Sequence, residues 1–157
     1  MLLPFFNNYT SFITLQRIKT TTKNMAKKEQ QREKNEAFMA QKATEPHIKS
    51  LGGGVLYEII ASGEGERCPT PASVVTLHYR GTLINGREFD NSYKRGCPEA
   101  MRVSDLIEGF SLALQNMHTG DHWRVYIPWQ MGYGKRSSGP IPAFSTLIFE
   151  IQLIGIA

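Results

Sequence analysis

Much of the chain alternates between apolar and polar residues with a period of two. That period places apolar side chains on one face of a strand and polar side chains on the other. Five runs of sequence show the pattern: residues 55–60, 75–80, 87–90, 122–127 and 147–153. Asn85-Gly86 lies between the second and third runs, and this residue pair is typical of a tight hairpin turn. The pattern predicts a series of short strands, two of which form a hairpin.

Residues 104–117 follow the period of a helix instead. Apolar side chains recur on one face at Ile107, Phe110, Leu114 and Met117, as in a helix that packs against a core. The elements therefore follow in the order of three strands, one helix and two strands. This order lacks the alternation of strands and helices that builds a parallel sheet. We predict an α+β fold in which an antiparallel sheet packs on one short helix.

A charged helical arm is expected upstream of the strands. Residues 26–44 are rich in helix-forming residue types and contain no proline or glycine. Pro46 and the run Gly52-Gly53-Gly54 mark the end of this helix and a hinge. We therefore expect residues 25–50 to form an arm and linker, and residues 51–157 to form the folded domain. The apolar stripe of the arm is too thin to favour a dimerisation helix.

The first 24 residues have a different character. Their apolar run ends at Phe6, no basic segment precedes it, and a secretory signal needs a longer apolar stretch. Met25 and the residues after it are typical of the start of a cytoplasmic protein. We interpret residues 1–24 as an upstream extension that is non-native or disordered, and we expect a cytoplasmic protein. The alternative is a targeting signal in residues 1–24, which would place the protein in the periplasm.

The positive net charge of +4 is concentrated in the first third of the chain. Residues 1–50 contain nine of the 18 Lys and Arg and four of the 14 Asp and Glu, which leaves nine basic and ten acidic residues for 51–157. A balanced domain is not typical of nucleic-acid binding, so we expect no nucleic-acid partner. A solvated helix explains the charged arm more simply than a tether to RNA. The chain contains no run of about 18 apolar residues, so no membrane span is predicted.

The sequence offers no pattern for metal, cofactor or nucleophilic chemistry. Cys68 and Cys97 do not form a CxxC pair and have no zinc-site spacing. We expect two reduced thiols, and a single disulfide is the alternative. Motifs for metalloproteases, serine hydrolases, phosphate loops and dinucleotide binding are missing. We therefore expect neither a metal nor a cofactor.

The placement of the aromatic residues indicates a pocket. Phe89 stands directly before Asp90 after the expected hairpin, and Tyr133 lies in a loop between two glycines. Tyr79 and Phe149 occupy the centres of expected strands. Each ring alone is explained well enough by ordinary core packing. Together with a loop rich in glycine and proline, they predict an apolar pocket with a few polar groups.

Several segments resemble the FKBP family of peptidyl-prolyl cis-trans isomerases. They are Val75-Thr-Leu-His-Tyr79-Arg-Gly81-Thr-Leu83, Asn85-Gly86-Arg-Glu-Phe89-Asp90-Asn-Ser92, Leu106-Ile107-Glu-Gly109-Phe110 with Leu114, Met117 and Gly120, Tyr133-Gly134, Ile141-Pro142, and Thr146-Leu147-Ile148-Phe149-Glu150-Ile151. The resemblance covers nearly all of residues 51–157. It implies a half-barrel, in which a curved antiparallel sheet wraps around one short helix.

The resemblance also implies a function and its residues. The domain is expected to accelerate rotation about X-Pro bonds during protein folding by binding the twisted amide in an aromatic pocket. Proline-containing peptides and unfolded protein clients are the expected partners, and tacrolimus-type macrolides are possible ligands. The residues expected to act in catalysis are Asp90, Tyr133, Phe89 and Ile107. The residues expected to bind substrate are Tyr79, Arg95, Leu106, Phe110, Ile141 and Phe149.

The chain departs from the family pattern at a few of these positions. Phe110 stands where the family usually has tryptophan, and Glu99 or Ala100 where an aromatic residue is common. Pro140 and Ala143 also differ from the frequent residue types. These departures affect ligand affinity and macrolide sensitivity more than the basic activity. They also motivate an alternative function, a proline-peptide binding or chaperone module with little catalysis.

Overall fold

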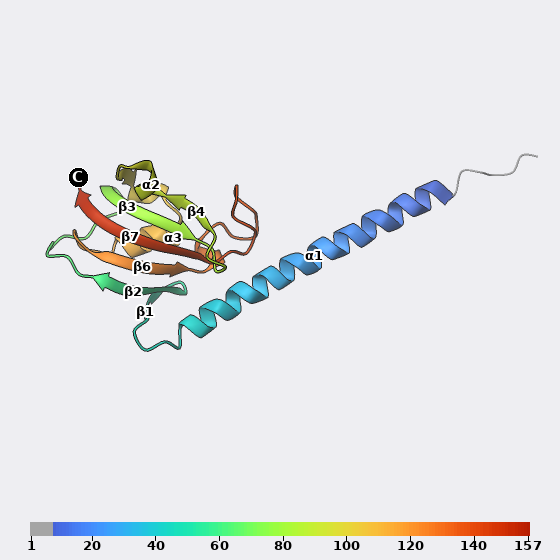
Figure 1. The fold of residues 1–157 in the computed structure, drawn as a ribbon, viewed down its shortest axis with the longest axis horizontal. Coiled ribbons are helices and arrows are strands. Elements are labelled where there is room, and N and C mark those ends of the chain that lie inside the picture. The colour runs from blue at the N-terminus through green and yellow to red at the C-terminus, as the bar shows by residue number, and fades with distance from the viewer. Residues whose placement is uncertain (1–7) are drawn as a thin grey trace, which may run out of the picture.

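The computed structural model describes residues 8–157, which form one long helix followed by an α+β domain (Figure 1). The long helix, α1 (Asn8–Lys42), extends away from the domain for most of its length. The domain contains, in chain order, β1 (Lys49–Gly52), β2 (Val55–Ala61), β3 (Val74–Thr82), β4 (Glu88–Asn91), α2 (Ser92–Arg95), β5 (Glu99–Arg102), the 3-10 helix η1 (Val103–Asp105), α3 (Glu108–Leu114), β6 (His122–Ile127), the 3-10 helix η2 (Trp129–Met131) and β7 (Leu147–Ile156).

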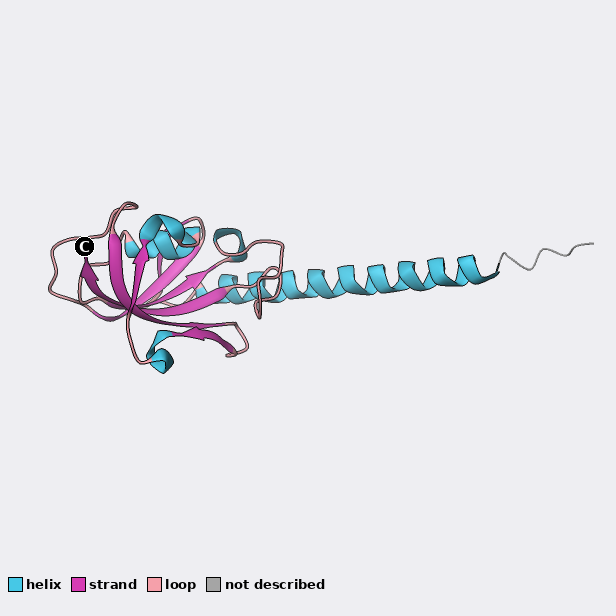
Figure 2. Ribbon diagram, turned by 90° about the horizontal axis from the view of Figure 1, so that it is seen from above, coloured by secondary structure: helices cyan, strands magenta, loops and turns pink. Residues whose placement is uncertain are grey.

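The strands form one antiparallel sheet of seven. Six of them are neighbours in the order β1, β2, β6, β7, β3, β4, and β5 pairs with β3 outside this row. The sheet is strongly curved, and short helices lie on both sides of its strands (Figure 2). This arrangement confirms the predicted fold class, a curved antiparallel sheet around a short helix with a helical extension before it.

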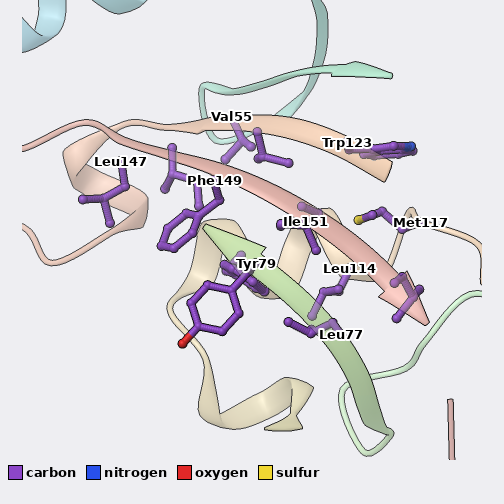
Figure 3. Packing of buried hydrophobic residues seen from close by; sticks show 14 of the residues in the cluster. Val55, Leu77, Tyr79, Leu114, Met117, Trp123, Leu147, Phe149 and Ile151 are labelled. Carbon is purple, nitrogen blue, oxygen red and sulfur yellow. The ribbon is translucent and has the colours of Figure 1, made fainter. Parts of the chain in front are cut away.

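The core lies between the sheet and α3. On β3 and β7 every second side chain is buried, as the period of two requires. Leu77 from β3, Leu114 from α3 and Ile151 from β7 are fully buried and meet in one cluster (Figure 3). Each such side chain contributes about 1.5–3 kcal/mol of burial free energy, which holds α3 against the sheet.

The expected hairpin is present. β3 and β4 pair antiparallel, with Gly81 opposite Asp90. The turn is closed by hydrogen bonds from the Leu83 N–H to the Arg87 carbonyl and from the Gly86 N–H to the Leu83 carbonyl, both 2.9 Å. Gly86 has φ 83°, a value that glycine adopts without strain. The five predicted strands are all confirmed with boundaries that differ by at most three residues, whereas β1, β5 and α2 were not predicted.

The helix of the domain is shorter than the predicted span of 104–117. Leu106 and Ile107 have extended backbone angles, so α3 begins only at Glu108. The side chains of Phe110, Leu114 and Met117 face the core as the pattern indicates. Ile107 instead stands at the helix N-cap, where it is half-buried. The apolar spacing therefore identified the buried face correctly but not the helix boundary.

α1 begins well upstream of the expected arm. Residues 8–24 are helical rather than disordered, while residues 1–7 lie outside the described part of the chain. Whether residues 1–24 belong to the native protein stays a prediction. Phe12 and Met25 are 62% and 67% exposed. No helix within residues 8–157 is both long and apolar enough to span a bilayer.

Candidate functional site

A cavity of about 470 Å³ opens between the β3–β4 side of the sheet and the N-terminal end of α3. Strands β3, β4 and β7 each supply aromatic side chains, and the long loop between η2 and β7 closes one side. The cavity is lined by Tyr79, Phe89, Asp90, Met101, Asp105, Leu106, Ile107, Phe110, Tyr133, Ser138, Gly139, Pro140, Ile141 and Phe149. Nine of the ten side chains expected at the site therefore converge on one cavity, although they come from distant parts of the chain.

Four aromatic rings build its floor and walls. Phe110 and Phe149 meet edge to face with ring centres 4.9 Å apart, and Phe89 meets Phe149 in the same way at 5.5 Å. The Tyr79 ring stands edge-on to Phe110 at 6.0 Å. Edge-to-face contacts at these distances are favourable for aromatic rings. Tyr79 and Phe149 lie side by side, with the tyrosine hydroxyl pointing away from the core (Figure 3).

Gly81 allows the aromatic walls to approach the sheet. It lies in β3 opposite Phe149 of β7. A Cβ atom at this position would lie 2.6 Å from the Phe89 ring and 2.9 Å from the Phe149 ring, too close for any ordinary contact. The absence of a side chain at residue 81 is therefore what leaves room for both rings.

Asp90 is fixed by three hydrogen bonds at the rim of the cavity. The Tyr79 hydroxyl donates to Oδ2 at 2.5 Å, and Nη1 of Arg95 and the Asn91 N–H donate to Oδ1 at 2.5 and 2.9 Å. Arg95 also donates through Nη2 to the Tyr79 hydroxyl at 3.0 Å and through Nε to Glu99 at 2.8 Å. The carboxylate thus has a single orientation relative to the aromatic walls.

These contacts decide the charge states of the site. Burial opposes ionisation of Asp90, but the hydrogen bonds from Tyr79 and Arg95 outweigh it and lower the pKa of the carboxyl below its usual value of 3.8. Burial, and then the hydrogen bond to Asp90, raise the pKa of Tyr79 to about 12. The hydrogen bonds to Asp90, Glu99 and Tyr79 raise the pKa of Arg95. At neutral pH the site therefore holds a carboxylate, a neutral phenol and a guanidinium.

Two polar groups remain available to a ligand. Ile107 is the N-cap residue of α3, and N–H groups at a helix N-terminus have no partner within the helix. Tyr133 is 45% exposed, and its hydroxyl makes no hydrogen bond within residues 8–157. Both residues line the cavity. A bound peptide could therefore offer one carbonyl to each of them.

The sequence missed part of the lining. Met101 comes from β5 and Asp105 from η1, while Ser138, Gly139 and Pro140 form the tip of the long loop. Arg95, in contrast, does not line the cavity but holds Asp90 from behind. No sequence signal identified Met101, because residues 99–102 do not alternate between polar and apolar types and form too short a run to indicate a strand. No cluster of side chains suited to a metal ion occurs in the described part of the chain.

Residues 65–154 match the family model described as FKBP-type peptidyl-prolyl cis-trans isomerase. The chain is 41% identical over 120 residues to a macrophage infectivity potentiator from Trypanosoma cruzi, which covers 76% of this chain and 61% of that relative. It is 38% identical over 125 residues to the peptidyl-prolyl cis-trans isomerase Mip of Coxiella burnetii, with coverage of 79% and 54%. The chain therefore spans only 54–61% of the length of these two relatives.

Solved structures agree with this match. The crystal structure of FkpA from Escherichia coli superposes with a TM-score of 0.79 at 34% identity and covers 97% of this chain and 74% of that one. A peptidyl-prolyl cis-trans isomerase from Pseudomonas syringae gives a TM-score of 0.77 at 35% identity, with coverage of 82% and 95%. On both the family model and these relatives, the chain belongs to the FKBP-type peptidyl-prolyl cis-trans isomerase family.

Proposed function

We propose that this chain is a peptidyl-prolyl cis-trans isomerase whose active site is the aromatic cavity beside Asp90. The observation that carries the proposal is the convergence of Tyr79, Phe89, Phe110 and Phe149 around a space of about 470 Å³, with a fixed carboxylate at its rim. A pyrrolidine ring is small and apolar, so a cavity with aromatic walls suits it. Membership of the family supports the same conclusion.

The reaction needs stabilisation of a twisted amide rather than a covalent intermediate. Rotation about the peptide bond costs about 18–20 kcal/mol because the resonance of the planar amide is lost. A twisted amide has a less polar carbonyl, so an apolar site binds it better than the planar ground state. Such differential binding of the transition state is what accelerates a reaction. Each ~1.4 kcal/mol of it raises the rate about tenfold.

Each residue of the site has a proposed role in this scheme. Phe110 is the floor for the proline ring, and Phe89 and Phe149 are its walls. The Ile107 N–H and the Tyr133 hydroxyl bind substrate carbonyls, while Leu106 and Ile141 complete the apolar lining. The carboxylate oxygens of Asp90 place a fixed negative charge near the carbon of the rotating carbonyl. Tyr79 and Arg95 hold that carboxylate in place.

An NMR exchange measurement on short peptides with an X-Pro bond tests the proposal directly. The full chain should raise the cis-trans exchange rate above the uncatalysed rate, which corresponds to tens to hundreds of seconds at about 25 °C. Asp90→Ala should reduce this acceleration strongly. If the folded wild-type chain leaves the exchange rate at background, the proposed activity is refuted.

One observation favours a second function. Phe110 has a smaller ring system than the tryptophan that the family usually has at this position, so it makes less contact with a bound proline ring. The chain could then bind proline peptides or unfolded clients as a chaperone module with little catalysis. Saturable peptide binding without faster exchange would support this alternative. Both functions predict that Phe149→Ala weakens peptide binding.

Other features remain proposals as well. We infer a cytoplasmic location because Cys68 and Cys97 are both free thiols, as in a reducing compartment. Cell fractionation would decide between this and the periplasmic alternative.

We also propose that tacrolimus-type macrolides bind the cavity, with an affinity limited by Phe110. Residues 25–50 act in this scheme as an arm and linker before an isomerase domain that spans 51–157.

A further inference from the structure

The last turns of α1 make a buried polar contact with the domain. Asn35 is only 1% exposed, although most of α1 faces solvent. Its Oδ1 accepts a hydrogen bond from the Thr146 N–H at 2.7 Å, and its Nδ2 donates to the Gln31 carbonyl at 2.8 Å. The Thr146 hydroxyl donates to the Asn35 carbonyl at 3.4 Å. Thr146 is fully buried, so Asn35 supplies the acceptor that its backbone N–H needs.

This contact lies at one end of the loop that closes the cavity. The loop, residues 132–146, connects η2 to β7 and carries both Tyr133 and Ile141 into the cavity lining. Thr146 is its last residue. Asn35 therefore holds the end of the segment that presents these two side chains to a ligand.

A second contact ties α1 to the other end of the same loop. Nε1 of Trp129, in η2, donates to Oε1 of Glu36 at 3.1 Å. The Trp129 ring packs edge to face on Phe144 with ring centres 5.0 Å apart. The last residue of the loop and the turn that precedes its first residue are therefore both bonded to neighbouring residues of α1, at Asn35 and Glu36.

Internal hydrogen bonds tie the two ends of the loop to each other. The Gly134 N–H donates to the Trp129 carbonyl and the Phe144 N–H to the Gly134 carbonyl, both at 2.9 Å. Phe144 has φ 58°, a left-handed conformation in which a non-glycine residue is strained. Such a residue keeps this conformation only when its surroundings impose it. The contacts with α1 are part of those surroundings.

We propose that Asn35 is a positioning residue of the active site, which sets the place of Tyr133 and Ile141 through the loop of residues 132–146. The inference rests on the proposed function and extends it, because it makes substrate binding depend on the helical arm. Without Asn35 the Thr146 N–H is left buried without an acceptor, and such a group moves or draws in water to regain one. The loop would shift, and the side chains of Tyr133 and Ile141 would move from their positions in the cavity lining.

The test compares two variants of the full chain. Asn35→Ala removes the acceptor for Thr146. Phe38→Ala is the matched control, because Phe38 lies one turn further along α1 and packs on Tyr126 of β6, at a ring distance of 6.2 Å, outside the loop. For each variant, kcat and KM for an X-Pro peptide are measured by NMR exchange. Amide hydrogen exchange is followed at Ile141 and Phe144.

We expect Asn35→Ala to raise KM about two- to thirtyfold with a smaller change in kcat, because lost substrate positioning weakens binding generally. Amide exchange at Ile141 and Phe144 should accelerate, while exchange in β6 and β7 stays unchanged. Phe38→Ala should leave KM within about twofold of wild type. The domain core lies within residues 51–156, outside α1, so both variants should fold, which circular dichroism checks.

Wild-type values of KM and amide exchange in the folded Asn35→Ala protein would overturn the inference. Equal effects of Asn35→Ala and Phe38→Ala would also overturn it, because they would show that docking of the whole arm matters rather than Asn35. If the wild-type chain proves inactive, the proposed function fails. The exchange rates at Ile141 and Phe144 still decide in that case whether Asn35 holds the loop.

Discussion

Gly81→Ala is the sharpest test of the aromatic cavity. The added Cβ would lie 2.6 Å from the Phe89 ring and 2.9 Å from the Phe149 ring, whereas ordinary contacts begin at 3.4 Å. One or both rings must therefore move by at least several tenths of an ångström. Phe149 is 5% exposed and packed on Phe110 and Tyr79, so the half-buried Phe89 is the ring that yields.

The expected cost can be estimated from these contacts. Overpacking a well-packed site costs about 1–3 kcal/mol. Alanine recovers about 0.4–1 kcal/mol of this by reducing the freedom of the unfolded chain. The free energy of unfolding should therefore fall by at most about 2.5 kcal/mol. Displacement of a wall of the active site can cost about 100-fold in rate, so kcat/KM should fall about tenfold to hundredfold.

Gly155→Ala is the matched control for this experiment. Gly155 also lies in a strand that pairs with β3, but a Cβ added there meets no atom within 4 Å and its φ is not strained. Its kcat/KM should stay at the wild-type value. NMR exchange measures turnover, and urea unfolding measures stability. If Gly81→Ala is folded and isomerises the peptide as fast as Gly155→Ala, the rings do not form the catalytic wall.

Four other perturbations follow from the site. Asp90→Asn should lower kcat/KM about tenfold or more, because an amide cannot accept the three hydrogen bonds that fix the carboxylate; a wild-type rate would remove Asp90 from the mechanism. Phe149→Ala should reduce the free energy of unfolding by about 3–5 kcal/mol in a urea titration, through a cavity in the packed core. The activity should be constant from about pH 5 to about pH 9, because Asp90 gains its proton only below its usual pKa and Tyr79 loses its own near its raised pKa; an inflection in a pH-rate profile within this range would contradict these assignments. Phe110→Trp should tighten tacrolimus binding about fivefold in calorimetry by enlarging the floor of the cavity.

The strands that bury only one face were predictable from the sequence. The strands at 74–82 and 147–156 bury one face only, so their alternation is clear in the residues. β1 and β5 have four residues each, and a period of two cannot be established over so short a run. The extension of α1 to Asn8 was missed because residues 1–24 were interpreted from their lack of a signal pattern and from the possible start at Met25, rather than from helix propensity.

The aromatic residues alone indicated a pocket, but most residues of the site were identified only through motifs. Nine side chains that now surround the cavity were identified from the family pattern, and no single one could be distinguished from core packing by its own spacing. The contact between Asn35 and Thr146 left no pattern, because a lone asparagine in a charged helix is typical of a solvent-exposed position. Its burial depends on where α1 meets the domain, which is a tertiary property.

The proposed active site depends on position more than on reactivity. Asp90 and Arg95 form an ion pair at its rim, and both keep one charge state across the neutral range. The hydrogen bonds that cause these pKa shifts therefore fix the geometry of the site and do not prepare a proton transfer. Turnover in such a site should respond to residues that place the walls, such as Gly81, as strongly as to residues that form them. A survey of substitutions confined to the cavity lining would consequently underestimate how much of the chain determines the activity.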